Sequence, residues 1–181
     1  MKNKAVFFDR DGIINKRILG DYVKIISDFE LNPEIPEILK FVKDRGFLAI
    51  IISNQQGVGK GIMSKKNLDD VHNYMQNLLL QKSGVAFDDI YVCTELASSD
   101  SFNRKPNPGM ILSAAEKYNI DLHSSIMIGD TDSDILAARN AGVCSILVAE
   151  SQENSNPDYY ISELNNLLIL LKKILPELNN A

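Results

Sequence analysis

Short apolar runs alternate with amphipathic segments along this chain, and no other feature limits its possible folds as strongly. Each run is nearly continuous in Val, Ile and Phe and ends in polar or glycine-containing sequence, which is typical of strands buried on both faces of a parallel sheet. Tyr159 and Tyr160 predict a further, short edge strand. The buried strands are predicted at residues 4–8, 47–52, 90–93, 126–128 and 145–148.

The intervening segments carry apolar residues at helical spacing, with Asn32 and Ser64 as candidate N-caps and Pro176 as a final stop. Strands that alternate with helices predict right-handed crossovers and a three-layer α/β/α sandwich around a mainly parallel, Rossmann-like sheet. No repeat or Pro/Ser-rich linker interrupts the pattern, so residues 1–181 are expected to form a single domain. The helices are predicted at 33–45, from 64 to just before Gly84, and at 109–118, 133–141 and about 162–175.

The composition is that of an ordinary globular protein, with 45% hydrophobic and 24% charged residues. The net charge of −5 argues against a large basic face for nucleic acid. Cys93 and Cys144 are too few for a disulfide framework and are expected to be reduced thiols. No apolar run approaches the roughly 20 residues of a membrane span. We expect a soluble cytoplasmic protein that binds neither nucleic acid nor membrane.

Ligands of such sheets bind beyond the carboxyl ends of the strands, so the residues that follow each run are the candidate site. Asp9 and Asp11 follow the first run. Two carboxylates at the end of a buried strand are costly unless a cation offsets them, and they can divide the work of nucleophile and general acid/base. A solvated Asp-Gly turn explains the same residues equally well.

The second and third strands are also followed by residues suited to an anion. Ser53 and the amides of residues 54–56 precede a glycine-containing loop, which is either a neutral anion cradle or an ordinary loop. It is neither a P-loop, since position 54 is Asn, nor a dinucleotide fingerprint, since its third glycine would fall at Ile62. Arg104 and Lys105 suit a phosphate, although a solvated basic turn is as good an explanation.

Three alternating aspartates follow the fourth strand, at positions 130, 132 and 134. They suggest a hard cation, but Ile135 and Ala141 stand where an EF-hand loop requires Gly and Glu. Asp132 or Ser133 is expected to cap the helix that follows. Asp130, nearest the strand end, is the best metal candidate.

Taken together and in this order, the four segments resemble the four motifs of the haloacid dehalogenase superfamily of phosphatases. The matching residues are DxDG at 9–12, the strand-end Ser53, Lys105, and GDxxxD at 129–134. The finer matches DRDGIIN, SNQQGVGKG and RKPNPGM resemble the branch that contains the heptose 1,7-bisphosphate and histidinol-phosphate phosphatases. The resemblance covers roughly residues 4 to 150.

The resemblance implies a role for each matching position. Asp9 would be the nucleophile and Asp11 the general acid/base, while Ser53 and Lys105 would stabilise the transferring phosphoryl group. Mg²⁺ would be held by Asp9, the backbone carbonyl of Asp11, and Asp130. The substrate would be bound by Asn15, Asn54, Gln55, Gln56 and Arg104, and Asp134 would orient Lys105 or the metal's water.

Many heptose bisphosphate phosphatases carry a zinc loop before the lysine motif, and this chain departs from that pattern. Cys93 is followed by Thr94 and Glu95, and no second cysteine precedes Arg104. One thiolate cannot make a structural zinc site, so no Zn²⁺ is expected and the loop at 94–103 should be held by its own packing. The intervals between motifs leave no room for a cap domain.

The implied activity is a Mg²⁺-dependent phosphatase that acts through an aspartyl-phosphate, with the 7-phosphate of D-glycero-D-manno-heptose 1,7-bisphosphate as the preferred target. Histidinol-phosphate and polynucleotide 3′-phosphatase are alternative activities. A catalytically silent binding or assembly module is an alternative of a different class. A monomer with a small phosphorylated substrate is expected, and His72 and His123 are both expected to be solvated.

Overall fold

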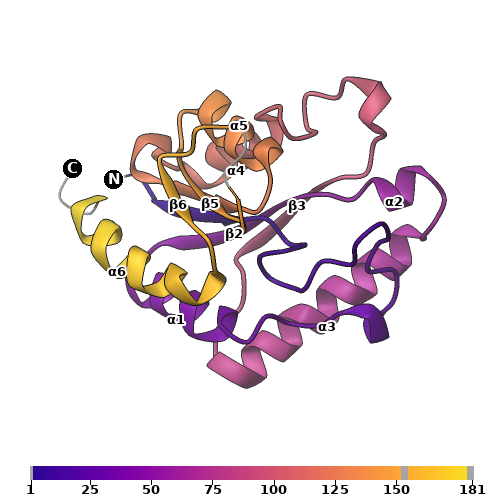
Figure 1. Ribbon diagram of the computed structural model, residues 1–181, viewed down its shortest axis with the longest axis horizontal. Helices are drawn as coiled ribbons and strands as arrows, with labels where there is room; N and C mark the ends of the chain where they lie inside the picture. Colours follow the sequence, from indigo (N-terminus) through magenta and orange to yellow (C-terminus); the bar gives the residue numbers. More distant parts are fainter. Residues whose placement is uncertain (1, 152–154, 179–181) are drawn as a thin grey trace.

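Six parallel strands form the central sheet of the computed structural model, which describes residues 2–151 and 155–178 (Figure 1). Their order across the sheet is β3-β2-β1-β4-β5-β6, and every neighbouring pair is parallel. The predicted sheet is therefore confirmed, including its short edge strand. The strands are β1 (Ala5–Phe8), β2 (Leu48–Asn54), β3 (Asp89–Cys93), β4 (Ile126–Gly129), β5 (Cys144–Val148) and β6 (Tyr159–Ile161).

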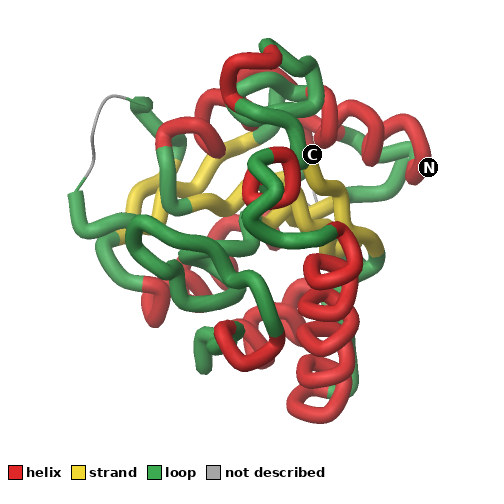
Figure 2. Tube along the Cα trace, turned by 90° about the vertical axis from the view of Figure 1, so that its right-hand side faces the viewer, coloured by secondary structure: helices red, strands yellow, loops and turns green. Residues whose placement is uncertain are grey.

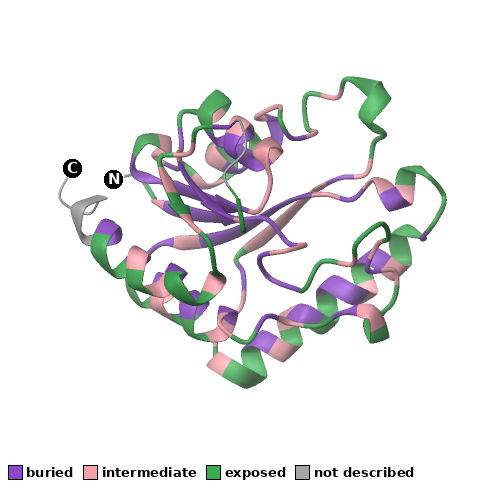
Figure 3. Cartoon of the chain, in the orientation of Figure 1, coloured by how far each residue is buried: buried purple, intermediate pink, exposed green. Residues whose placement is uncertain are grey.

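Helices cover both faces of the sheet, which gives the three layers predicted from the sequence (Figures 1 and 2). Successive side chains of a strand point to opposite faces. Val6 and Phe8 accordingly pack with α1, α3 and α6, while Ala5 and Phe7 pack with α4 and α5. The four central strands are buried on both sides, whereas the edge strands β3 and β6 are only partly buried (Figure 3). The helices are α1 (Ile35–Asp44), α2 (Gln56–Gly59), α3 (Lys65–Ser83), α4 (Gly109–Tyr118), α5 (Asp132–Ala141) and α6 (Leu167–Leu178).

The strand order reverses direction next to β1. The chain runs outward from β1 through β2 to β3 and then returns to place β4 on the other side of β1. Such a reversal opens a crevice at the carboxyl ends of the two strands that flank it. The residues after β1 and β4 therefore meet there, and the backbone N–H of Asp9 donates to the carbonyl of Ile128 at 2.9 Å.

Two helix starts differ from those predicted. Helix α1 is preceded by Glu34 at the N-cap, whereas the side chain of Asn32 is turned inward and donates to the carbonyl of Ile13 at 2.7 Å. Helix α5 is capped by Thr131 in a capping box with Asp134, not by Asp132 or Ser133. The predicted caps are of suitable residue types. However, the Asn32 side chain is bound to the Ile13 carbonyl instead, and Thr131 occupies the N-cap position of α5.

Helix α6 also differs from its prediction at both ends. A 3₁₀ turn at Leu164–Asn166 precedes it, so the α-helix begins at Leu167, about five residues later than expected. It continues past Pro176 to Leu178, since a proline in the last turn removes only one backbone donor. Within the described ranges, no helix combines the length and the apolar character needed to cross a membrane.

Replacing Ser64 with Ala should lower the free energy of unfolding by about 1 kcal/mol. The Ser64 hydroxyl caps α3 by accepting from the backbone N–H of Asn67 at 3.0 Å, as predicted, and alanine leaves that donor without its partner. Urea unfolding measures the change. Asn73→Ala, on the exposed side of the same helix, is the matched control and should cause no loss. Equal losses in both variants would contradict the capping role.

Candidate active site

The residues that follow β1, β2 and β4 surround a cavity of about 270 Å³ at the carboxyl edge of the sheet. Asp9 and Asp11 follow β1, Asn54 ends β2, and Lys105 arrives from the loop before α4. Gln56 and Arg104 also line this cavity, as expected of residues that meet a ligand. The structure thus brings together residues that are up to 125 positions apart in the sequence.

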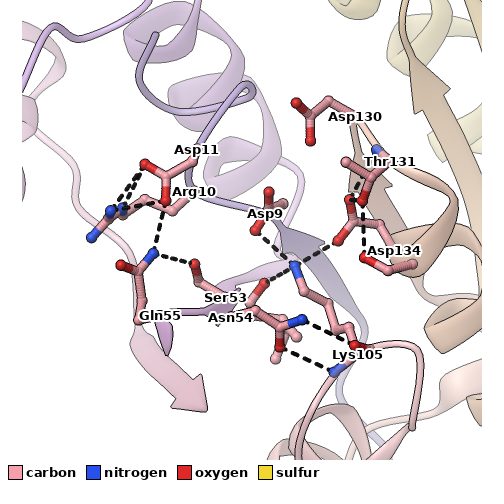
Figure 4. A network of polar contacts seen from close by, with 12 residues as sticks. Asp9, Arg10, Asp11, Ser53, Asn54, Gln55, Lys105, Asp130, Thr131 and Asp134 are labelled. Atoms are coloured by element: carbon pink, nitrogen blue, oxygen red, sulfur yellow. Dashed lines mark hydrogen bonds and ion pairs between the residues drawn. The ribbon is translucent and has the colours of Figure 1, made fainter. Parts of the chain in front are cut away.

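Lys105 lies at the centre of a buried ionic cluster (Figure 4). Its Nζ is 2.7 Å from Asp9 Oδ1 and 2.5 Å from Asp134 Oδ1, and it donates to the carbonyl of Ile52 at 2.8 Å. The side chains of Lys105 and Asp134 are only 3% and 1% exposed. Two hydrogen bonds, to Asp9 and Ile52, and one ion pair, with Asp134, therefore fix the lysine in place.

Asn54 secures the loop that carries Lys105. Its amide oxygen accepts from the backbone N–H of Lys105 and its amide nitrogen donates to the same residue's carbonyl, both at 3.0 Å. The side-chain amide of Asn54 thus pairs with the Lys105 backbone as a neighbouring strand would, at the end of β2. Asn54 was predicted to contact substrate, and the structure adds a positioning contact that the sequence pattern did not indicate.

The ionic cluster shifts the pKa values of its members. Burial raises the pKa of Asp9 to about 6, against the opposing effect of Lys105. Burial alone would lower the pKa of Lys105, but the carboxylates of Asp134 and Asp9 outweigh it and raise that pKa above its ordinary value. Lys105 is therefore a permanent cation beside the predicted nucleophile.

Asp9, Asp130 and Asp134 place carboxylate oxygens within 4.8 Å of one another, close enough to share a metal ion. Asp134 is already committed, because its Oδ2 accepts from the Thr131 hydroxyl at 2.6 Å and its Oδ1 faces Lys105. Asp130 Oδ1 is buried and has no hydrogen-bond partner. An orphaned carboxylate oxygen beside Asp9 fits a hard divalent cation, which prefers oxygen ligands.

Asp130 is strongly perturbed. Burial, followed by the charges of Asp9 and Asp134, raises its pKa to about 8. Arg17 partly offsets this with an ion pair at 3.1 Å to Asp130 Oδ2. The negative charge gathered around Asp130 exceeds what Arg17 and Lys105 supply, which is the electrostatic condition that a metal ion would relieve.

Glycine is required at two motif positions by close approach. A Cβ atom at Gly12, where φ is +103°, would lie 2.0 Å from Asp130 Oδ2. A Cβ atom at Gly129 would lie 2.2 Å from the Cβ of Asp134. Both glycines therefore leave room for the carboxylates of the cluster.

Asp11 occupies a second, separate polar cluster (Figure 4). Arg10 Nη2 donates to both of its carboxylate oxygens at 2.9 Å, and Asn15 and Gln55 donate at 3.0 and 2.8 Å. Burial would raise the pKa of Asp11, but Arg10 and these amides outweigh it and hold the pKa below its ordinary value. The two motif carboxylates therefore have different partners: Lys105 for Asp9 and Arg10 for Asp11.

Three predicted site residues lie deeper than expected. Asn15 and Gln55 are fully buried and contact Asp11, so in this structure they are not placed along the cavity as substrate-binding residues. Ser53 is 1% exposed, and its hydroxyl accepts from Gln55 at 2.8 Å. Sequence spacing locates these residues at the strand end but does not show which way each side chain points.

Sequence reasoning missed two residues of the second cluster. Arg10 is fully buried, and His72 is only 7% exposed, so the prediction that His72 is solvated is wrong. Arg10 Nη1 lies 3.2 Å from His72 Nε2. Asp70 and Asn73 near His72 in the sequence favour an exposed position, whereas its partner Arg10 is 62 positions away. The one available signal was the position of Arg10 itself, a cation between two motif aspartates. His123 is exposed, as predicted.

Comparisons with known proteins agree with this arrangement. The family model described as HAD-hydrolase-like matches residues 102–167. The D-glycero-beta-D-manno-heptose-1,7-bisphosphate 7-phosphatase of Helicobacter pylori strain J99 is 40% identical over 88% of this chain and 90% of its own length. The D-glycero-alpha-D-manno-heptose-1,7-bisphosphate 7-phosphatase of Photorhabdus laumondii is 39% identical over 96% of this chain and 97% of its own length.

A solved structure shares the fold over nearly the whole chain. The D,D-heptose 1,7-bisphosphate phosphatase from B. bronchiseptica, crystallised with magnesium and phosphate, superposes with a TM-score of 0.85 at 24% identity. The match covers 94% of this chain and 99% of that one. At this identity the likeness supports the fold.

Mg²⁺ should bind more tightly as the pH rises from 6 to 8. The carboxyl of Asp130, with its pKa near 8, must lose its proton to ligate the ion, so each ion bound releases a proton. We expect the association constant to rise about tenfold per pH unit and to level off above pH 8. Calorimetry in buffers of different ionisation enthalpy measures both the affinity and the protons released.

The control variant for this titration is Asp130→Asn, which should bind Mg²⁺ weakly and without the pH slope. Whereas the affinity for Mg²⁺ should rise with pH, the stability of the ion-free protein should fall. A carboxyl whose pKa is raised on folding from 3.8 to about 8 contributes stability that is lost as the pH rises through that interval. In EDTA the melting temperature should therefore fall from pH 6 to 8. An affinity that stays flat over this range would contradict the assignment of Asp130.

Proposed function

Because the chain belongs to the haloacid dehalogenase-like hydrolases, a family of phosphatases, we propose that it removes the 7-phosphate of D-glycero-D-manno-heptose 1,7-bisphosphate. The observation that carries the proposal is the buried contact of Asp9 with Lys105 beside Asp130, at the edge of a cavity lined by charged and polar side chains. Support for the substrate comes from relatives at 39–40% identity over most of this chain that carry this activity in their names.

In the first half-reaction, a carboxylate oxygen of Asp9 attacks the phosphorus atom while the bond from phosphorus to the sugar oxygen breaks. Lys105 holds Asp9 in place and neutralises part of the charge of the incoming phosphate. Asp11 supplies the proton that the leaving oxygen needs. The products of this step are the free alcohol and an aspartyl-phosphate at Asp9.

In the second half-reaction, a water oxygen attacks the same phosphorus atom and the bond to Asp9 breaks. Asp11, now a carboxylate, takes the proton of that water, so both aspartates return to their starting forms. Asp9 and Asp130, with the backbone carbonyl of Asp11, would hold Mg²⁺. When bound, Mg²⁺ supplies positive charge that allows the phosphate dianion to approach a carboxylate.

A bisphosphate needs a second anion site, and the cavity wall offers cations for it. Arg17 and Arg104 line the cavity in addition to Lys105, which is already held by Asp9 and Asp134. Arg104 is held by the Glu95 carbonyl at 3.1 Å and by Gln56 Oε1 at 3.4 Å, which directs its guanidinium along the cavity wall. A guanidinium suits the planar, two-point recognition of a phosphate.

We also propose a monomer that works in the cytoplasm and uses no zinc. Cys93 and Cys144 are both free thiols, in keeping with a reducing compartment. The loop between β3 and Lys105 contains its own hydrogen bonds, including one from the N–H of Arg104 to the Ser101 carbonyl at 3.0 Å. Such local bonds can shape the loop without a metal ion.

Asp9→Asn should reduce phosphate release at least about 1,000-fold, because an amide cannot form the aspartyl-phosphate. Malachite green detection of inorganic phosphate measures the rate. The matched control is Asp132→Asn, which changes the first residue of α5. Asp132 does not line the cavity, so this variant should keep its activity. Undiminished turnover by Asp9→Asn would exclude the mechanism.

Among phosphorylated metabolites, both anomers of the heptose 1,7-bisphosphate should give the highest kcat/KM, and EDTA should abolish the activity. Removal of one phosphate from the substrate should raise KM, because a contact of the second phosphate with the arginines is lost. Histidinol phosphate and a 3′-phosphorylated oligonucleotide complete the panel. Strong turnover of histidinol phosphate with none of the bisphosphate would reassign the substrate but leave the phosphatase mechanism intact.

A further inference from the structure

A histidine on α3 and an arginine inside the first motif form a buried support for Asp11. The side chain of Arg10 is 0% exposed, and that of Asp11 is 24% exposed and borders the cavity. Arg10 therefore lies behind Asp11, on the side away from a bound substrate. His72 lies behind Arg10 in turn, with its Nε2 3.2 Å from Arg10 Nη1.

The donors of Arg10 are divided between these two partners. Nε and Nη2 are directed at the Asp11 carboxylate, at 3.2 and 2.9 Å, and Nη1 is directed at His72. An arginine has only donors, so the contact requires His72 Nε2 to be unprotonated and to accept. Burial, followed by the charge of Arg10, lowers the pKa of His72 to about 4, which keeps the imidazole neutral.

The position of His72 is itself fixed by the core. Its neighbours Val71 and Met75 on α3 are fully buried against the sheet, so the helix cannot easily rotate or shift. The guanidinium of Arg10 is planar, so a contact that fixes Nη1 at His72 also fixes the direction in which Nε and Nη2 point at Asp11. The orientation of the Asp11 carboxylate then follows from α3, through two hydrogen-bonded contacts.

We propose that His72 is a positioning residue for the general acid/base Asp11 and acts on it through Arg10. This inference rests on the proposed phosphoryl transfer through Asp9. His72 touches neither substrate nor phosphorus, and its effect is confined to the steps in which Asp11 moves a proton. Asp9 is held independently by Lys105, so its attack on phosphorus does not depend on His72.

The two half-reactions separate these effects when the leaving group is changed. A sugar alkoxide needs a proton from Asp11 as its bond to phosphorus breaks, whereas p-nitrophenolate is stable without one. Hydrolysis of the aspartyl-phosphate needs Asp11 to take a proton from water in either case. A displaced Asp11 therefore slows both half-reactions of the sugar phosphate but only the second half-reaction of p-nitrophenyl phosphate.

The test compares His72→Leu and His72→Asn, which cannot reach Arg10 with an acceptor, with His72→Gln, whose longer side chain can. In single-turnover measurements, the Leu and Asn variants should release the sugar from the heptose bisphosphate about tenfold more slowly than the unaltered protein. With p-nitrophenyl phosphate they should show a rapid burst of about one nitrophenol per active site at an unchanged rate, followed by turnover about tenfold slower. His72→Gln should restore both rates to within about threefold.

Two results would overturn the positioning role. One is a burst rate that falls as much as the sugar-phosphate rate, because that pattern marks a general disturbance of the site. The other is a set of variants whose rates equal those of the unaltered protein on both substrates. If His72→Leu fails to fold, the difference in rates between His72→Asn and His72→Gln decides whether His72 positions Asp11. If the unaltered protein forms no phosphoenzyme on either substrate, the proposed function fails instead, whatever the variants do.

Discussion

The buried contact of Lys105 with Asp9 and Asp134 determines how the rest of the site is built. One ammonium group is shared by two carboxylates that lie deep in the protein, and Asp130 adds a third acid to the same cluster. Buried charges are tolerated only when they are paired and hydrogen-bonded. When all three are ionised, these carboxylates carry more charge than Lys105 and Arg17 offset, so a further cation would ease the approach of a phosphate dianion.

The parallel sheet makes such a concentration of charge possible. The reversal of strand order beside β1 brings the ends of β1, β2 and β4 to one crevice, and each end contributes charged or polar groups. The apolar strands and the helices on both faces fix these ends rigidly. Gly12 and Gly129 allow the acidic loops to approach more closely than any side chain would permit. The rigid positions of the charges therefore come from the core, not from the loops themselves.

The residues of the fold and of the first charge cluster can be predicted from the sequence because their signals are local. An apolar run in the sequence indicates a buried strand, and the next polar residue marks its carboxyl end. The direction in which a side chain points depends instead on residues that are distant in the sequence. Asn15 and Gln55 turn inward to Asp11, and the contact between Arg10 and His72 joins residues 62 positions apart, so spacing within a motif cannot reveal either. Thr131 takes the cap of α5 because its hydroxyl also meets Asp134, a tertiary detail of the Lys105 cluster.

Separate cations give two identical side chains different chemistry. Asp9 has its pKa raised to about 6 by burial, and Lys105 keeps one of its oxygens in place near the cavity. Asp11 has its pKa lowered, since Arg10 and the amides of Asn15 and Gln55 donate hydrogen bonds to its ionised form. A carboxyl group in that setting is ionised at neutral pH, which is the form that the proposed second half-reaction requires. The protonated form required by the first half-reaction is bound less strongly by Arg10, because a neutral carboxyl attracts a guanidinium less. The contact with Arg10 therefore favours the carboxylate form of Asp11 and makes its protonated form a stronger acid.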